Sequence, residues 1–304
     1  MMVMRDIPSE TLRVLRKEAG FVCANPACSS PYLEFHHFDP PFALHPHHNP
    51  DGMIALCTGC HRRADAGAFS HDELRQWKSS CRKPTSVTGH FDFKSEQVLL
   101  SAGGGVFVGA ETLLTLNGSR IAWLSNEEGK MLLNLEIQDP DGREIVMRDN
   151  CWVAPTDFFE IESPPHAHAL KIRRKLGQIV ASVHFRRLHT AELRVLLRKR
   201  HDKMATQAAR MDEKLAAESD QRRRKMVEDG LLPDFRPSPR ISSAPTEAER
   251  DERTDEELRL IETKFSNDDF VLCTLGGDFG GSPDVLVGPV RGDVGRMSLD
   301  AAAA

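Results

Sequence analysis

Four of the seven cysteines in this 304-residue chain fall into two close pairs near its N-terminus. Cys23 and Cys28 are separated by four residues, and Cys57 and Cys60 by two. Two thiolate pairs on separate loops supply the four ligands of a closed, tetrahedral structural zinc site. The 28 residues between the pairs form a sizeable loop, so the metal would hold together a small domain with little core of its own. We therefore expect these four cysteines to bind Zn²⁺.

The alternative is that the four cysteines are reduced residues of a hydrophobic core, which would leave their paired spacing unexplained. The other three cysteines, Cys81, Cys151 and Cys273, are isolated in the sequence. An odd and uneven set of cysteines does not suit a disulfide scaffold. A capping box at Ser70–Glu73 predicts a helix that places Cys81 on one face with Leu74 and Trp77, so we expect Cys81 in the core.

A second set of side chains suited to metal and acid–base chemistry lies between and just after the cysteine pairs. His36 and His37 are adjacent at the end of a short strand-like run, whereas His61 and Asp65 are four residues apart on a predicted helix face. Neutral imidazole binds divalent cations and can also act as a general base. A flat strand would point His36 and His37 to opposite sides. The break predicted at 39–41, Asp-Pro-Pro, would allow both to reach one site.

Residues 21 to 67 resemble the HNH endonucleases, the ββα-metal nucleases that include nuclease colicins and many phage and restriction enzymes. The resemblance rests on the His36-His37 pair, on the signature Leu56-Cys57-Thr58-Gly59-Cys60-His61, and on the outer cysteine pair found in zinc-stapled members. It covers about 50 residues of the chain. Fusions of such a module to a separate domain are similar to bacterial antiphage effectors and restriction systems.

The resemblance implies that His36 and His61 ligate a catalytic divalent cation, Mg²⁺ or another, and that Asp65 is a further ligand. It implies that His37 is the general base that activates water, while the four cysteines hold a structural zinc remote from the chemistry. Such a site hydrolyses phosphodiester bonds of nucleic acid, for which DNA is the expected substrate.

The chain departs from the family pattern at one position. The asparagine that orients the base histidine in the family normally lies five residues before the first cysteine of the Cys-x2-Cys-His signature, where this chain has Gly52. Asn49 and Asp51 are the candidates to orient His37 instead. If neither does so, Gly52→Asn should raise the cleavage rate. The alternative function is therefore a catalytically degenerate zinc module that binds DNA or protein.

Nucleic-acid contacts are expected from a local patch, because 40 Lys and Arg against 45 Asp and Glu give the chain a net charge of -5. The candidates on or near the motif helices are Arg62, Arg63 and Lys78. His45, His47 and His48, in the loop before the second strand, either line the substrate groove or are solvated.

The elements that position these residues are a capped helix ending near Gly20, strands near 33–38 and 53–56, and a helix from His61. Short β-type runs separated by the turn signals Asn117-Gly118, Glu128-Gly129 and Asp141-Gly142 follow them. We predict an α+β protein with four parts: an N-terminal ββα-metal zinc module (1–83), an all-β sandwich or barrel-like domain for recognition or regulation (89–188), a charged helix (190–230), and a linker, short acidic helix and flexible tail (231–304).

Within the charged helix, five apolar residues have heptad-compatible spacing: Leu197, Met204, Ala208, Met211 and Leu215. This spacing allows a homodimer through the helix, although packing on the β domain is the simpler interpretation. No run approaches the roughly 18 apolar residues of a membrane span, and the first ten residues lack the apolar core of a secretory signal. We therefore expect a cytoplasmic protein without membrane contact.

Overall fold

The computed structural model describes residues 6–102, 105–108, 111–116, 118–234, 237, 243–264 and 269–276. The described residues form two compact units, one from the ranges 6–187 and 271–276 and the other from the range 188–270. The protein is of mixed α+β class, as expected, with five helices and three sheets among the described residues. None of these helices combines the length and hydrophobicity needed to cross a membrane.

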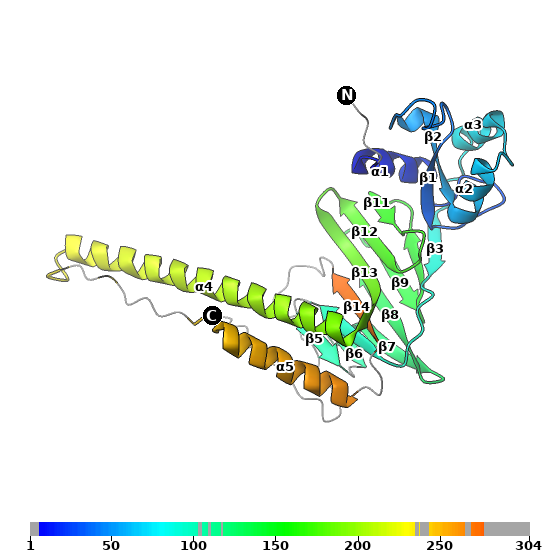
Figure 1. The fold of residues 1–304 in the computed structure, drawn as a ribbon. Coiled ribbons are helices and arrows are strands. Elements are labelled where there is room, and N and C mark those ends of the chain that lie inside the picture. The colour runs from blue at the N-terminus through cyan, green and yellow to red at the C-terminus, as the bar shows by residue number, and fades with distance from the viewer. Residues whose placement is uncertain are drawn as a thin grey trace. The chain divides into compact units, whose positions relative to one another are not determined.

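The first part of the chain folds as two paired strands followed by a helix (Figure 1). Its elements are α1 (Ser9–Glu18), β1 (Leu33–His37), the 3-10 turn η1 (Pro50–Gly52), β2 (Met53–Cys57), α2 (Thr58–Asp65) and α3 (His71–Ser79). Strands β1 and β2 are antiparallel, in a register that pairs Leu33 with Cys57 and His37 with Met53. The capping box predicted for α3 is present, because the Ser70 side chain accepts from the Glu73 backbone and the Glu73 side chain accepts from the Ser70 backbone.

Two six-stranded sheets follow. The first has the order β3-β10-β9-β8-β7-β6, with β3 at Ser86–His90, β10 at Cys151–Pro155, β9 at Glu144–Arg148, β8 at Lys130–Gln138, β7 at Ser119–Glu127 and β6 at Thr112–Leu116. The second has the order β11-β12-β13-β14-β4-β5, with β11 at Glu160–Glu162, β12 at Ala169–Lys175, β13 at Gln178–His189, β14 at Asp269–Gly276, β4 at Val98–Ala102 and β5 at Gly105–Val108.

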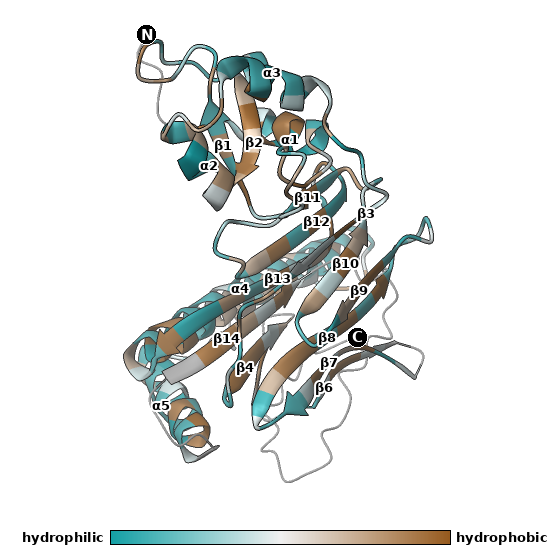
Figure 2. Ribbon diagram, turned by 90° about the vertical axis from the view of Figure 1, so that its right-hand side faces the viewer, coloured by the Kyte–Doolittle hydropathy of each residue, from teal (hydrophilic) through white to brown (hydrophobic). Residues whose placement is uncertain are grey.

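The two sheets share one hydrophobic core. Buried residues of both sheets, among them Leu133 and Ile145 from the first and Leu170 and Val183 from the second, form a single cluster. Alternate residues of the strands supply this cluster, as the brown bands along the strands in Figure 2 indicate. Two of the predicted turns contain a glycine in the left-handed backbone conformation that such turns require: Gly129, with φ of 82°, and Gly142, with φ of 81°.

Strand β14 was not expected, because the sequence interpretation placed residues 231–304 in a linker, an acidic helix and a tail. It lies between β13 and β4 and pairs in parallel with β4, Val271 opposite Val98. Cys273 in its centre is fully buried. A parallel partner some 170 residues away leaves no local sequence signal. The expected tail beyond Gly276, and Asn117 of the first turn signal, lie outside the described residues.

The second unit contains two helices, α4 (Thr190–Glu228) and α5 (Glu247–Lys264), which contact each other. The buried residues of α4 recur every four positions: Leu193, Leu197, His201 and Ala205. Arg200 and His201 approach Glu257 of α5, and Thr254 of α5 lies 2.8 Å from Nδ1 of His201. Met211 and Leu215, the later members of the expected heptad seam, are exposed. Association through this helix remains a prediction.

We predict that Gly89→Ala destabilises the β domain. Gly89 on β3 lies opposite the fully buried Trp152 on β10, and an added Cβ would stand 2.5 Å from Cζ2 of that indole. Overpacking of this kind costs about 1–3 kcal/mol. The free energy of unfolding in urea measures the effect. Gly59→Ala is the control, because nothing lies within 4 Å of its added Cβ. A loss no larger than that of the control would contradict the prediction.

Candidate functional site

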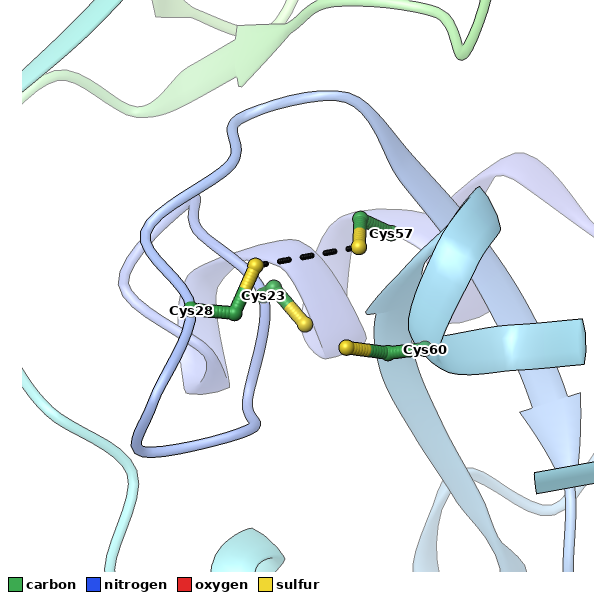
Figure 3. Close-up of side chains that lie close together, drawn as sticks. All are labelled: Cys23, Cys28, Cys57 and Cys60. Atoms are coloured by element: carbon green, nitrogen blue, oxygen red, sulfur yellow. Dashed lines mark hydrogen bonds between the residues drawn. The ribbon is translucent and has the colours of Figure 1, made fainter. Parts of the chain in front are cut away.

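The four paired cysteines converge on one point in the N-terminal module. One sulfur atom from each of Cys23, Cys28, Cys57 and Cys60 lies within 4.8 Å of the other three, and all four turn toward a common centre in Figure 3. The Sγ atoms of Cys28 and Cys57 are 3.7 Å apart. Four thiolates around a tetrahedral zinc, each at about 2.3 Å from it, stand about 3.8 Å from one another. The cluster is therefore compatible with a zinc site.

Short-range backbone features build both halves of this cluster. Cys57 ends β2 and is the N-cap of α2, so Cys60 follows one helical turn later. On the other half, the chain leaves α1 through Gly20 and Phe21, both with positive φ. The Cys28 backbone N–H then donates to the Asn25 carbonyl at 2.9 Å.

The electrostatics of the cluster also suit a metal. Burial alone would raise the pKa of the Cys57 thiol, but hydrogen bonds from the Cys60 backbone and the Cys28 side chain outweigh it and hold that pKa below its usual value. Burial raises the pKa of the Cys23 and Cys60 thiols. The buried Asn25 side chain donates to Cys60 Sγ at 3.3 Å. Thiols held in this way bind a cation as thiolates, with release of their protons.

A second group of possible ligands consists of the expected His36, His61 and Asp65, whose nearest donor atoms also lie within 4.8 Å of one another. The Asp65 carboxylate lies between the two rings, 3.2 Å from Nδ1 of His36 and 3.1 Å from Nδ1 of His61. Burial, reinforced by His61, lowers the pKa of His36 although Asp65 opposes the shift. Neutral imidazole is the form that ligates a metal. Strand β1 and helix α2 thus bring together residues that are 25 and 29 positions apart in the sequence.

Glu34 belongs to the same surroundings and was missed by the sequence interpretation. Its carboxylate lies 3.7 Å from Nδ1 of His61 and accepts a hydrogen bond from Thr58 Oγ1 at 3.1 Å. The signal was present, since Glu34 and His36 are two residues apart on a strand and therefore share a face.

His37 lies apart from that group. Strand pairing continues through His37, so the side chains of His36 and His37 point to opposite faces of the strand. The expected break at 39–41 lies beyond both histidines and does not bring them to one site. The His37 ring contacts Phe42, His47 and His48, with centroid separations of 4.9, 5.2 and 5.7 Å. Burial, together with His47 and His48, lowers the pKa of His37 to about 4. Its Nε2 is buried and has no hydrogen-bond partner in the described part of the chain.

Of the three loop histidines, His47 and His48 pack against the His37 ring. His45 is exposed. The two residues expected to orient His37 are engaged elsewhere or exposed. Asn49 Oδ1 accepts from the Asp51 backbone at 3.1 Å and so caps η1, and the Asp51 side chain is exposed. The His37 ring instead donates a hydrogen bond to the His47 backbone.

Gly52 is buried, and its carbonyl accepts hydrogen bonds from the backbone N–H groups of Phe38 and Asp39, at 3.0 and 3.2 Å. A Cβ added at Gly52 would lie 2.0 Å from the Asp39 carbonyl oxygen. The glycine is thus required by close backbone approach. An asparagine here does not fit, which overturns the expectation that Gly52→Asn would improve the site.

The three side chains expected to contact nucleic acid differ in whether they are exposed or already paired. Lys78 is mostly buried and pairs with Glu18. The Arg63 guanidinium carbon stands 4.6 Å from the centre of the Phe69 ring, and its side chain is exposed. Arg62, next to His61 on α2, is exposed as well. The two arginines therefore remain candidates, whereas Lys78 is committed to an internal ion pair.

We expect Cys23→Ser and Cys57→Ser to abolish zinc binding and to lower the melting temperature, because a structural zinc contributes on the order of 10 kcal/mol in small zinc domains. Zinc content by mass spectrometry and thermal unfolding measure both effects. The matched control is Cys81→Ser, whose thiol contacts the Trp77 carbonyl at 3.2 Å and lies outside the cluster. Parental zinc content and stability in the first two variants would refute the site.

Gly52→Ala should destabilise the module by about 3 kcal/mol and Gly52→Asn by at least as much, because the clash is with backbone. Asp51→Ala, one residue earlier and exposed, is the control and should change stability by less than about 0.5 kcal/mol. Urea unfolding of the three variants provides the comparison. Equal stability of Gly52→Ala and Asp51→Ala would show that the close approach to Asp39 imposes no constraint.

Comparison with family models, with curated proteins and with solved structures found no match to this chain.

Proposed function

We propose that the protein is a metal-dependent endonuclease of the HNH type that hydrolyses phosphodiester bonds of nucleic acid, with DNA as the expected substrate. The observation that carries the proposal is the convergence of His36, His61 and Asp65 from a strand and the helix that follows its partner strand. The strand–strand–helix order and the nearby cysteine cluster match what the HNH resemblance implies. Both features support a ββα-metal assignment for residues 21 to 67.

The donor set fits a divalent cation. Two imidazoles and a carboxylate match Mn²⁺, Ni²⁺ or Zn²⁺ better than Mg²⁺, because these three cations accept nitrogen ligands readily. A cation held there would supply positive charge to the scissile phosphate. The Asp65 carboxylate, a proposed ligand, contacts Nδ1 of both rings, and the Glu34 carboxylate lies 3.7 Å from Nδ1 of His61. A carboxylate beside a ligating imidazole, as Glu34 is, fixes the direction of the ring.

His37 is the residue that the HNH resemblance assigns as the proton acceptor. Its lowered pKa keeps the ring neutral at pH 7, and its buried Nε2 has no hydrogen-bond partner among the described residues. The His37 ring donates to the His47 backbone, which fixes the ring. In the proposed reaction the oxygen of a water molecule bonds to phosphorus while His37 takes the proton of that water, and the P–O bond to the leaving oxygen breaks as that oxygen takes a proton from solvent. Arg62 and Arg63, exposed on α2, would contact the phosphates on either side.

Two observations favour the alternative, a zinc module that binds nucleic acid or protein without cutting. Gly52 cannot accommodate the asparagine that orients the base in the family, and the His37 ring lies among the loop residues. The alternative predicts zinc in the cysteine cluster and no second cation at His36 and His61. Metal content with and without added Mn²⁺ therefore separates the two functions.

We predict that His37→Ala lowers the rate of plasmid cleavage by about 10²- to 10⁴-fold while zinc content and stability stay at parental values. His36→Ala and His61→Ala should instead raise the concentration of Mg²⁺, Mn²⁺ or Ni²⁺ needed for cleavage. His45→Ala, an exposed histidine of the same loop, is the matched control and should cleave like the parent. Equal cleavage by all four variants would place the activity outside this site, and no cleavage by the parent would favour the binding module.

A further inference from the structure

A cavity of about 480 Å³ lies between helix α1 and strands β11 to β13, within the first compact unit. This volume falls in the range of small-molecule sites, about 300–1,000 Å³. The charged side chains around it are Arg13, Arg16, Glu160, Glu162, Lys171 and Arg173. None of them belongs to the cysteine cluster or to the histidine group, so the cavity is separate from the candidate metal sites.

Positive charge exceeds negative charge around this cavity. Glu160, whose side chain is only 3% exposed, forms ion pairs with all three arginines. Glu162 pairs again with two of them, Arg16 and Arg173, at 3.6 and 3.3 Å. No ion pair is recorded for Lys171 within the described residues. Four cations thus face two carboxylates, which leaves an excess of two positive charges.

Some of the arginine side chains that carry this excess positive charge are partly shielded from water. Burial lowers the pKa of Arg16 even though Glu162 and Glu160 act to raise it. Arg13 Nε is shielded from solvent and lies 3.6 Å from Glu160 Oε2, beyond hydrogen-bonding distance. A cation that has lost water and lacks a full complement of acceptors attracts an anion strongly. Guanidinium groups are well matched to phosphate, which they can hold through two parallel hydrogen bonds.

The uncharged part of the lining consists of Ser9, Gly177 and three apolar residues. Leu12 of α1, Ile179 of β13 and Leu176 in the turn before it complete the wall, and Leu176 is 71% exposed. A ligand with an anionic end and a flat or apolar end would match both the cationic side chains and the apolar wall. A phosphate monoester carries about -1.5 to -2 charges at pH 7, which equals the local excess.

We propose that this cavity binds a small phosphate monoester that carries an apolar or planar group. The three arginines and Lys171 hold the phosphate, and the leucines and Ile179 contact the remainder of the ligand. The inference does not depend on the nuclease function, because none of its residues takes part in the proposed reaction.

The test is a calorimetric titration of the full chain with AMP, with adenosine and with inorganic phosphate. We expect AMP to bind, and adenosine to bind at least about tenfold more weakly, a difference of about 1.4 kcal/mol. Lys171→Met, which keeps the aliphatic stem but removes the charge, should weaken AMP binding about tenfold. Lys175 is on the same strand but outside the cavity lining, so Lys175→Met should change the affinity for AMP by no more than about twofold.

Binding of inorganic phosphate that is also weakened by Lys171→Met would support the phosphate subsite. Failure of AMP to bind the parent, or equal affinity of the two lysine variants, would overturn the proposal. A single-stranded oligonucleotide serves as the third probe. If Lys171→Met weakens oligonucleotide binding while AMP binds neither protein, the surface contacts a polymer and the proposal is wrong. Cleavage plays no part in these measurements, so their outcome is independent of the proposed nuclease function.

Discussion

The pairing of β1 with β2 is the constraint on which the N-terminal module depends. Its register places His36 opposite Ile54 and His37 opposite Met53, and it ends at Cys57, where α2 begins. A slip of one residue would exchange the faces of the two histidines and carry Cys57 away from the other cysteines. The hydrogen bonds from Phe38 and Asp39 to the Gly52 carbonyl close the pair at its far end. One short ladder therefore sets the positions of both candidate metal centres.

In the proposed nuclease the two centres would divide stability and chemistry between them. The thiols of Cys23 and Cys60 are buried, and their donor set suits a cation that is held permanently. The group of His36, His61 and Asp65 is half-buried to exposed and mixes nitrogen with oxygen donors, so a cation there would remain open to water and substrate. Helix α2 carries one ligand pair of the first centre at its start and two residues of the second on its next turns. Rigid coupling of this kind is what a functional site requires from its scaffold.

Sequence reasoning succeeded where the signal was local. The cysteine spacing predicted the thiol cluster, and the four-residue spacing of His61 and Asp65 predicted a shared helix face. It failed where the deciding partner lay elsewhere in the chain. The close approach of Asp39 to Gly52, the neighbours of His37 and the parallel pairing of β14 all arise from tertiary contacts. Glu34 is different, because strand alternation would have revealed it.

The tight fit at Gly52 has a consequence for how such a site can change over generations. The atom in the way is the Asp39 backbone oxygen, which every amino acid at position 39 possesses. No single replacement at that neighbour can therefore make room for a side chain at Gly52. Only a change in the length or course of the loop between them, residues 40 to 51, could do so. A chain with the asparagine of the HNH pattern at this position would therefore need a different course of this loop as well as the substitution.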